Sequence, residues 1–172
     1  MAIEVYISQV QIEKKVKELA AQINADYHGK EVVLVGVLTG SFIFCADLVR
    51  YLTIKNSIEF ISASSYEGAT TTSSGNVKIN LDLKRDIAGK HIILIEDIVD
   101  TGLTITQLTK MLKSRNPASM KLASLLFKKV RVEHPLTIDY LGFEIEDKFV
   151  IGYGLDYDGY YRELPYIGVY KA

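Results

Sequence analysis

The sequence predicts an α/β fold, in which a mostly parallel, twisted sheet is flanked by helices. Residues 32–37 and 92–95 are continuous apolar runs, which are typical of strands buried on both faces. Each run is followed by a short polar loop and then by apolar residues at helical spacing, so strands and helices alternate along the chain. Short strand patterns follow at 140–143 and 149–152. The 172 residues are most simply a single domain, 1–172.

The first helix is expected directly after Ser8. Ser8 and Gln11 have the spacing of a capping box, in which each side chain bonds the other residue's backbone N–H. The apolar stripe of this helix consists of Ile12, Val16, Leu19 and Ile23. A second helix is expected at 42–52. It contains the sole cysteine, Cys45, which we expect to be a small core residue, and a single cysteine excludes an intramolecular disulfide.

A third strand, 58–63, leads into a long loop of small and polar residues, 64–76. A loop of this length inside a compact domain is usually a functional lid or a disordered linker. Apolar alternation resumes at 77–81, so the fold continues beyond the loop. We therefore expect a long flexible lid.

The end of the central strand carries the strongest chemical signal. Glu96, Asp97 and Asp100 put three carboxylates within five positions, directly before Thr101 and Gly102. Backbone N–H groups at the start of the next helix would attract an anion, and the glycine permits a close approach. The acids would repel a bare phosphate, but the ring hydroxyls of a sugar phosphate, or a bound divalent cation, would meet them. The pattern therefore predicts a ribose 5-phosphate site; an N-capped helix, the alternative, requires one acid rather than three.

Two other glycine-containing stretches fail as nucleotide-binding motifs. Gly40-Ser41 follows a predicted strand, but the lysine of a P-loop is missing and the spacing is too short. That loop either binds an anion through its backbone N–H groups or is only a tight connection. Gly152-Tyr153-Gly154 lacks the third glycine and the following helix of a dinucleotide-binding motif.

A further apolar strand ends at Lys128-Lys129. Paired lysines at a strand end are commonly just solvated, but in a parallel sheet the C-terminal strand ends gather at the ligand crevice. The N-terminal and C-terminal segments, about 1–10 and 148–172, are expected to form a small hood over this crevice. The tyrosine-rich stretch 155–170 is more typical of a core edge or a subunit contact than of a ligand site.

The composition bears on possible partners. A net charge of −1, with 48% hydrophobic and 24% charged residues, is typical of a soluble globular protein and gives no general attraction to nucleic acid or anionic membranes. No apolar run approaches the ~20 residues that span a bilayer, and the N-terminus lacks a signal-peptide pattern. We therefore expect a cytoplasmic protein with neither a nucleic-acid nor a membrane partner.

Residues 96–102, Glu-Asp-Ile-Val-Asp-Thr-Gly, resemble the phosphoribosyl-pyrophosphate motif of the type I phosphoribosyltransferases, in the form of the hypoxanthine/guanine branch. The resemblance extends over about 32–162, and its motifs occur in the family's order. Asp-Lys-Phe-Val at 147–150 and Leu-Asp-Tyr at 155–157 resemble motifs of the 6-oxopurine branch.

The resemblance implies a role for each matching residue. The phosphoribosyl group and its 5′-phosphate would be bound by Glu96, Asp97, Asp100, Thr101, Gly102, Leu103 and Thr104. Pyrophosphate would be bound by Thr39, Gly40 and Arg162, and the purine side by Lys128, Phe149, Val150 and Asp156. Mg²⁺ would be held by Glu96, Asp97 and Asp156, and the lid would close through Ser65 and Tyr66. Asp100 would be the catalytic base that removes the purine N7 proton.

The implied activity is Mg²⁺-dependent purine salvage. The 5-phosphoribosyl group would pass from phosphoribosyl pyrophosphate to N9 of hypoxanthine, and also of guanine, giving IMP or GMP and pyrophosphate. One alternative is an RNA-binding regulator built on the same fold, and another is a related enzyme that prefers xanthine or, less favourably, adenine. A homodimer or homotetramer is usual among the proteins that the sequence resembles.

Overall fold

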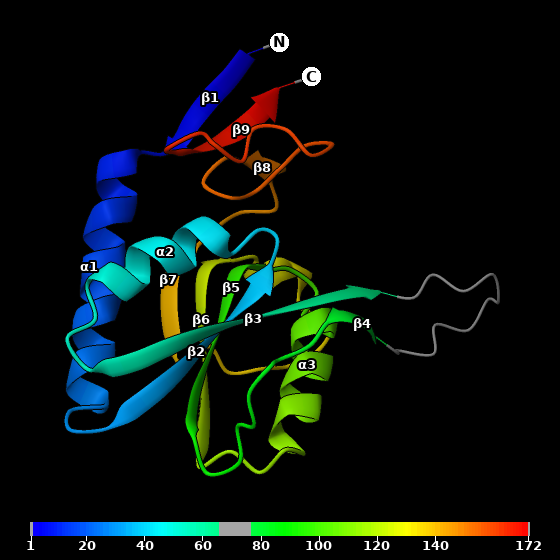
Figure 1. Ribbon diagram of the computed structural model, residues 1–172. Coiled ribbons are helices and arrows are strands. Elements are labelled where there is room, and N and C mark those ends of the chain that lie inside the picture. The colour runs from blue at the N-terminus through cyan, green and yellow to red at the C-terminus, as the bar shows by residue number, and fades with distance from the viewer. Residues whose placement is uncertain (1, 66–76, 172) are drawn as a thin grey trace, which may run out of the picture.

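The computed structural model describes residues 2–65 and 77–171. Its larger sheet has six strands in the order β4-β3-β2-β5-β6-β7 (Figure 1). All neighbouring strands are parallel except β3 and β4, which are antiparallel. The strands are β2 (Glu31–Leu38), β3 (Lys55–Ser65), β4 (Val77–Leu81), β5 (His91–Val99), β6 (Ser119–Phe127) and β7 (Tyr140–Glu144).

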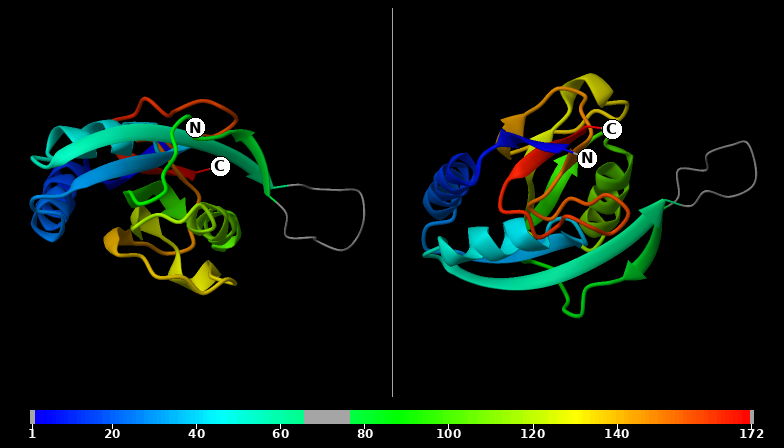
Figure 2. Two further views of the ribbon diagram at one scale, coloured as in Figure 1. Left: turned by 60° about the horizontal axis from the view of Figure 1, so that its bottom comes forward. Right: turned by 90° about the horizontal axis from the view of Figure 1, so that it is seen from above.

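Helices cover both faces of this sheet. Figures 1 and 2 show α1 (Gln9–Asp26) and α2 (Phe42–Arg50) on one face and α3 (Leu103–Lys113) on the other. Successive residues of the central strands therefore belong to different cores: Leu34 and Ile93 pack with α1 and α2, whereas their neighbours pack with α3. Because both faces are buried, β2 and β5 are almost continuously apolar.

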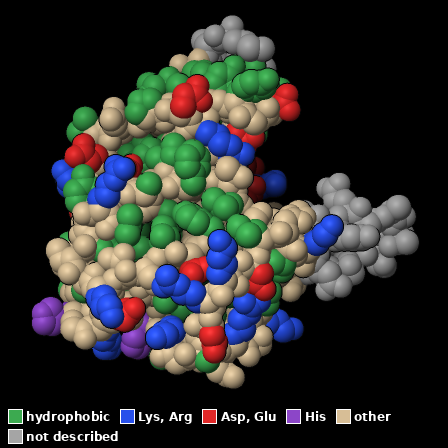
Figure 3. All heavy atoms as spheres, in the orientation of Figure 1, with side chains coloured by type: hydrophobic (Ala, Val, Ile, Leu, Met, Phe, Trp, Pro, Cys, Tyr) green, Lys and Arg blue, Asp and Glu red, His purple; other side chains and the backbone are tan. Residues whose placement is uncertain are grey.

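A smaller antiparallel sheet forms the hood. It joins β1 (Ala2–Ile7), β9 (Ile167–Lys171) and β8 (Val150–Ile151), in that order. Figure 1 shows it above the larger sheet, with the two ends of the chain side by side. The space-filling view in Figure 3 shows a hollow between the hood and the body of the molecule. The predicted fold class, including a hood built from terminal segments, is confirmed.

The first two helices form as the sequence predicts. The Ser8 N–H donates to Gln11 Oε1 at 2.9 Å, and the Gln11 N–H donates to Ser8 Oγ at 3.3 Å, which completes the capping box of α1. Cys45 in α2 is fully buried, and this burial raises the pKa of its thiol to about 12, as expected of an inert core residue. No helix in the described ranges is long and apolar enough to cross a bilayer.

The central strand is longer than predicted. The sequence predicts a strand at 92–95 followed by an acidic loop, but β5 continues to Val99 and includes Glu96 and Asp97. Glu96 pairs in register with Ser124 of β6, so its backbone belongs to the sheet. A carboxylate interrupts the apolar pattern without ending the strand, because the backbone ladder to β6 is independent of side-chain type.

Candidate active site

The candidate residues gather at one edge of the larger sheet. Strands β2, β5 and β6 are parallel, so Leu38, Val99 and Phe127 all end at that edge. Each is followed by a loop with predicted site residues, beginning at Thr39, Asp100 and Lys128 respectively. The crevice at the carboxyl ends of parallel strands is where ligands bind in α/β folds.

The Thr-Gly turn begins helix α3. Gly102 is its N-cap, with φ +85°, and the Leu103 N–H donates to Thr101 Oγ1 at 3.4 Å. A Cβ at Gly102 would lie 2.8 Å from the carbonyl oxygen of His134 and 2.6 Å from Leu136, so the turn has no room for another residue. A cavity of about 230 Å³ is lined by the continuous segment from Glu96 to Ile105.

The chemistry of this cavity suits an anion at one end. The first N–H groups of an α-helix lack partners within the helix and carry its positive dipole end. The first turn of α3 contains no acidic residue that would compete for these donors. The turn at Thr101–Thr104 can therefore bind a phosphate through backbone N–H groups and hydroxyls.

The two acids of β5 also line this cavity. Glu96 is 9% exposed, and its burial, followed by the adjacent Asp97 carboxylate, raises its pKa well above the usual value. Asp97 Oδ1 accepts from the Ile98 N–H at 2.8 Å. Two carboxylates this close attract a cation or hydroxyl donors, which relieve their mutual repulsion.

Two glycine contacts bring three loops together. The peptide bond between Leu38 and Thr39 is cis, and it leads into Gly40. A Cβ at Gly40 would collide with the carboxylate of Asp97, and a Cβ at Gly154 would collide with the carbonyl oxygen of Gly40. The loop after β2, the end of β5 and the hood segment after β8 are therefore in direct contact.

The hood segment brings Arg162 to this meeting point. Its guanidinium donates to the Gly154 carbonyl oxygen at 2.6 Å and pairs with Asp156 Oδ1 at 3.0 Å. The second carboxylate oxygen of Asp156 accepts from the Gly159 N–H at 2.7 Å. A guanidinium held in this way offers its remaining N–H groups to an anion.

A row of alternating charges follows the end of β6. Lys128 is 8% exposed, and its Nζ lies 3.3 Å from Asp147 Oδ1. Arg131 Nε lies 3.0 Å from Asp100 Oδ1 and 3.9 Å from Asp147 Oδ2. The Asp100 carboxylate raises the pKa of the Arg131 guanidinium, so that group is fully charged.

The purine-side residues differ in burial. Val150 is buried in β8, whereas Phe149 is 54% exposed and packs edge-to-face on Tyr157 with ring centroids 5.8 Å apart. The sequence predicts a strand over 149–152, but β8 comprises only Val150 and Ile151, which leaves the ring of Phe149 outside the sheet. An exposed aromatic face of this kind can stack on a flat heterocycle.

The three candidate metal ligands do not meet as one cluster. Within residues 2–65 and 77–171, no group of three or more His, Cys, Asp or Glu side chains is arranged to hold a metal ion. Glu96 and Asp97 adjoin each other, whereas Asp156 is engaged by Arg162. Mg²⁺ commonly takes one or two carboxylates and completes its shell with waters and substrate phosphates, so the acidic pair fits a substrate-borne Mg²⁺.

Some candidates lie beyond what the structure describes, and some site residues were missed. Ser65 ends β3, and Tyr66, its predicted partner in the lid, lies outside the described residues. Arg131 and Asp147 were not predicted as site residues, although they contact Asp100 and Lys128. The sequence contains one indication of Arg131. It lies three positions after Lys128, and residues three apart lie on the same side of a helical turn.

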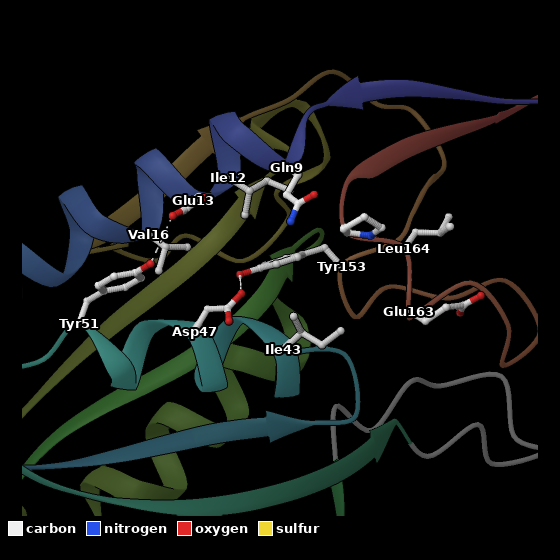
Figure 4. Close-up of a pocket in the computed structure, with 11 residues that line it drawn as sticks. Gln9, Ile12, Glu13, Val16, Ile43, Asp47, Tyr51, Tyr153, Glu163 and Leu164 are labelled. Atoms are coloured by element: carbon white, nitrogen blue, oxygen red, sulfur yellow. Dashed lines mark hydrogen bonds between the residues drawn. The ribbon is translucent and has the colours of Figure 1, made fainter.

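A second cavity, of about 320 Å³, lies away from the Thr-Gly turn. Figure 4 shows it between α1, α2 and the hood segment, and it is lined in part by Gln9, Glu13 and Tyr153. Tyr153 donates through its hydroxyl to Asp47 Oδ2 at 2.6 Å across this cavity. None of the predicted site residues lines it.

Comparison with known proteins agrees with this geometry. Residues 6–158 match the phosphoribosyl transferase domain family. The chain is 48% identical to a hypoxanthine-guanine phosphoribosyltransferase of Dictyostelium discoideum, over 99% of this chain and 97% of that protein.

Solved structures give the same relationship. A hypoxanthine-guanine phosphoribosyltransferase of Bacillus anthracis is 44% identical, with a TM-score of 0.93 over 98% of both chains. A hypoxanthine phosphoribosyl transferase of Trypanosoma cruzi, studied for the role of its C-terminal region in oligomeric state and activity, is 42% identical, with a TM-score of 0.92 over 98% of this chain and 91% of that one. These relatives support neither a regulator without catalytic activity nor an enzyme that prefers xanthine. The chain belongs to the phosphoribosyltransferase family, in its hypoxanthine-guanine branch.

Proposed function

We propose that the protein transfers the 5-phosphoribosyl group of phosphoribosyl pyrophosphate to N9 of hypoxanthine and of guanine. The bond from ribose C1 to the pyrophosphate oxygen breaks, the bond from C1 to purine N9 forms, and the purine loses one proton. The products are IMP or GMP and pyrophosphate. The observation that carries this proposal is the cavity of Glu96 to Ile105, which joins a helix N-terminus to a pair of acids.

The 5′-phosphate binds at the start of α3. Backbone N–H groups between Asp100 and Thr104, including that of Leu103, together with the hydroxyls of Thr101 and Thr104, are its donors, and Gly102 leaves room for it. Glu96 and Asp97 then face the ribose hydroxyls. They also stabilise the positive charge that develops on the ribose ring as the pyrophosphate leaves, an effect larger in the transition state than in the ground state.

Pyrophosphate binds where the three loops meet. Backbone N–H groups of Thr39 and Gly40 face it from the loop after β2, and Arg162 faces it from the hood. The proposed cofactor is Mg²⁺: the adjacent Glu96 and Asp97 would hold it together with the substrate, and Asp156 would approach it from the hood. When bound, the ion would offset the charge on the leaving pyrophosphate. Ser65 and Tyr66 close over the reactants and exclude water.

The purine lies between the hood and the end of β6. Phe149 stacks on the ring, the backbone of Val150 contacts its edge, and the Lys128 ammonium donates to the 6-oxygen. The resemblance to the 6-oxopurine motif adds Asp156 to the proposed purine side. Asp100 is the general base: its carboxylate accepts the N7 proton as N9 bonds to the ribose.

We propose further that the protein is cytoplasmic and assembles as a homodimer or homotetramer, without a nucleic-acid or membrane partner. The near-neutral net charge of −1 supports the absence of nucleic acid. The Trypanosoma cruzi relative, studied for the role of its C-terminal region in oligomeric state, supports assembly into an oligomer. In this chain the last strand, β9, belongs to the hood.

A turnover assay tests the proposed function. Purified protein is incubated with phosphoribosyl pyrophosphate, Mg²⁺ and hypoxanthine, guanine, xanthine or adenine in turn, and nucleoside monophosphate and pyrophosphate are both measured. We expect turnover with hypoxanthine and guanine, and loss of it when EDTA removes Mg²⁺. Turnover confined to adenine, or salt-sensitive RNA binding without turnover, contradicts the proposal.

A further inference from the structure

The row of charges at the end of β6 connects the base-reading lysine to the candidate proton acceptor. From one end to the other, the contacts are Lys128 Nζ to Asp147 Oδ1 at 3.3 Å, Asp147 Oδ2 to Arg131 Nε at 3.9 Å, and Arg131 Nε to Asp100 Oδ1 at 3.0 Å. The four groups alternate in sign. No other salt bridge of these four residues is present in the described part of the chain.

The backbone holds the ends of this row in place. The Lys128 N–H donates to the Val99 carbonyl oxygen at 3.0 Å, directly before Asp100. The Arg131 N–H donates to the Lys128 carbonyl oxygen at 2.9 Å and closes the short 3₁₀ turn Lys129–Arg131. Movement is therefore left to the side chains, and those of Arg131, Asp147 and Asp100 are 47%, 49% and 43% exposed.

The two inner contacts are unequal. Arg131 is close to Asp100 at 3.0 Å, whereas the 3.9 Å to Asp147 is longer than a hydrogen bond. Asp147 is instead engaged by Lys128, whose ammonium is buried and requires a partner. In this state Arg131 occupies Oδ1 of Asp100, so only Oδ2 of that carboxylate is left to accept a proton from a purine.

We propose that Asp147 and Arg131 are positioning residues that couple reading of the purine 6-position to release of the Asp100 carboxylate. An acceptor at the purine 6-position draws the Lys128 ammonium away from Asp147. Asp147 then closes its 3.9 Å gap to Arg131 and draws the guanidinium from Asp100. The freed Asp100 oxygen takes the N7 proton: the N7–H bond breaks, an O–H bond forms, and the carboxylate becomes a neutral acid. This coupling rests on the proposed function.

The coupling would let the site discriminate between purine bases in the chemical step, which a contact between Lys128 and the base alone does not. An amino group at the 6-position is a donor and offers Lys128 nothing to bind, so Arg131 stays on Asp100. A wrong base is then rejected in the proton-transfer step as well as in binding. Selectivity of this kind appears in kcat, whereas a lost contact that is equal in ground and transition states appears only in KM.

Four proteins test the coupling: wild type, Asp147→Asn, Arg131→Gln and the double variant, each with hypoxanthine, phosphoribosyl pyrophosphate and Mg²⁺. Asp147→Asn cannot draw Arg131 away, so kcat should fall about tenfold, within the roughly 10²–10⁴-fold that a positioned base contributes, while KM for hypoxanthine does not rise. Arg131→Gln removes the guanidinium from Asp100 Oδ1, so both carboxylate oxygens are free. The double variant should therefore recover at least about half of the decrease in log kcat that Asp147→Asn causes.

Recovery of kcat in the double variant distinguishes coupling from structural damage. If each substitution only damaged the structure, their effects would add and kcat would fall further. Glu146→Gln is the matched control, because that neighbouring carboxylate pairs with Lys148 at 2.6 Å and not with the row; its kcat should stay within about twofold. An unchanged kcat in Asp147→Asn, or a double variant slower than both single variants, overturns the coupling. Wild-type protein that fails to convert hypoxanthine overturns the proposed function instead.

Discussion

At the scale of single residues, the candidate site depends on positions where a side chain would not fit. Gly102 begins α3 with φ +85°, and the space where its Cβ would lie is taken by the His134 carbonyl oxygen and Leu136. The consequence is chemical, because the turn stays open toward the cavity and presents backbone N–H groups instead of a side chain. The acids depend on their surroundings in another way. Burial removes the Glu96 carboxylate from water, and a bound cation or ribose would offset this cost in solvation.

Replacement of Gly102 tests the phosphate turn. Gly102→Ala combines a strained φ with the 2.8 Å contact to the His134 carbonyl oxygen, so the free energy of unfolding should fall by about 1–3 kcal/mol, and KM for phosphoribosyl pyrophosphate should rise. Gly89→Ala is the matched control: φ there is +69°, but nothing lies within 4 Å of the added Cβ. Equal effects of the two substitutions on KM would remove the turn from substrate binding.

Replacement of Asp100 tests the general base. Asp100→Asn keeps the size of the side chain but cannot accept the N7 proton, so kcat should fall roughly 10²–10⁴-fold, whereas the Kd of phosphoribosyl pyrophosphate should change little. Stopped-flow or rapid-quench kinetics with a separate binding titration measure the two quantities. Asp158→Asn, an exposed substitution in the hood segment, is the control. Near-normal kcat in Asp100→Asn would exclude this carboxylate from proton transfer.

At the scale of elements, polar contacts at the ends of helices and strands set how α1 meets the sheet. Asp26, the last residue of α1, accepts from the Tyr140 hydroxyl at 2.6 Å and from Lys121 Nζ at 3.0 Å. These partners lie on β7 and β6, so the contact joins three elements that are far apart in the chain. It fixes the end of α1 opposite the crevice, where a rigid support is useful to the site.

This contact makes a pH-dependent contribution to stability. The Tyr140 hydroxyl, followed by Lys121, lowers the pKa of Asp26 below its usual value of 3.8. A lowered pKa in the folded state means that the stabilisation is complete above pH 3.8 and disappears as the pH falls through the folded-state pKa. Asp26→Asn should therefore unfold at a lower temperature than wild type at pH 7, and the difference should shrink below pH 3.8.

Thermal unfolding followed by circular dichroism at several pH values measures this difference. Glu144→Gln, an exposed carboxyl at the end of β7, is the control, and its small effect on Tm should not depend on pH in the same range. A difference between Asp26→Asn and wild type that is the same at pH 3 and pH 7 would contradict the assigned contact.

At the scale of the whole molecule, the site is assembled from a body and a hood. In the candidate site, the body contributes the Thr-Gly turn and the acids from one continuous segment, and the hood carries the candidate residues Phe149, Asp156 and Arg162. The two parts touch where Gly154, with φ +99°, lies against the carbonyl oxygen of Gly40. A change at this contact should therefore alter the position of the hood over the substrate, although Gly154 itself carries no reactive group.

Gly154→Ala tests this contact. The added Cβ would collide with the Gly40 carbonyl oxygen, so the hood must shift; KM for phosphoribosyl pyrophosphate should rise about tenfold, and the free energy of unfolding should fall by about 1–3 kcal/mol. Gly159→Ala, in the same segment, has φ +82° with open space around the added Cβ, and should show only the loss in stability. Equal KM values for the two variants would show that substrate binding does not depend on the contact between Gly154 and Gly40.

Much of this molecule follows from local sequence patterns. The buried strands, the capping box at Ser8 and the helix that begins after Gly102 each depend on neighbouring residues, and each is present in the structure. Local chemistry likewise predicts the cavity of Glu96 to Ile105, because all of its lining residues belong to one segment. Hydrophobic periodicity and helix-terminus chemistry act within a few residues, so a single sequence is enough to reveal them.

Only the tertiary structure decides which distant residues meet. β5 continues through its acids because β6 lies in register beside it, and no pattern within 92–99 reveals that register. Arg131 reaches Asp100, and Asp147 reaches Lys128, because the turn after β6 and the segment after β7 end at the same edge of the sheet. Contacts of this kind depend on strand order and on the path of the loops, and packing of the whole chain decides both. The sequence by itself therefore determined the Thr-Gly turn at the start of α3, and only the tertiary structure decided which charges surround it.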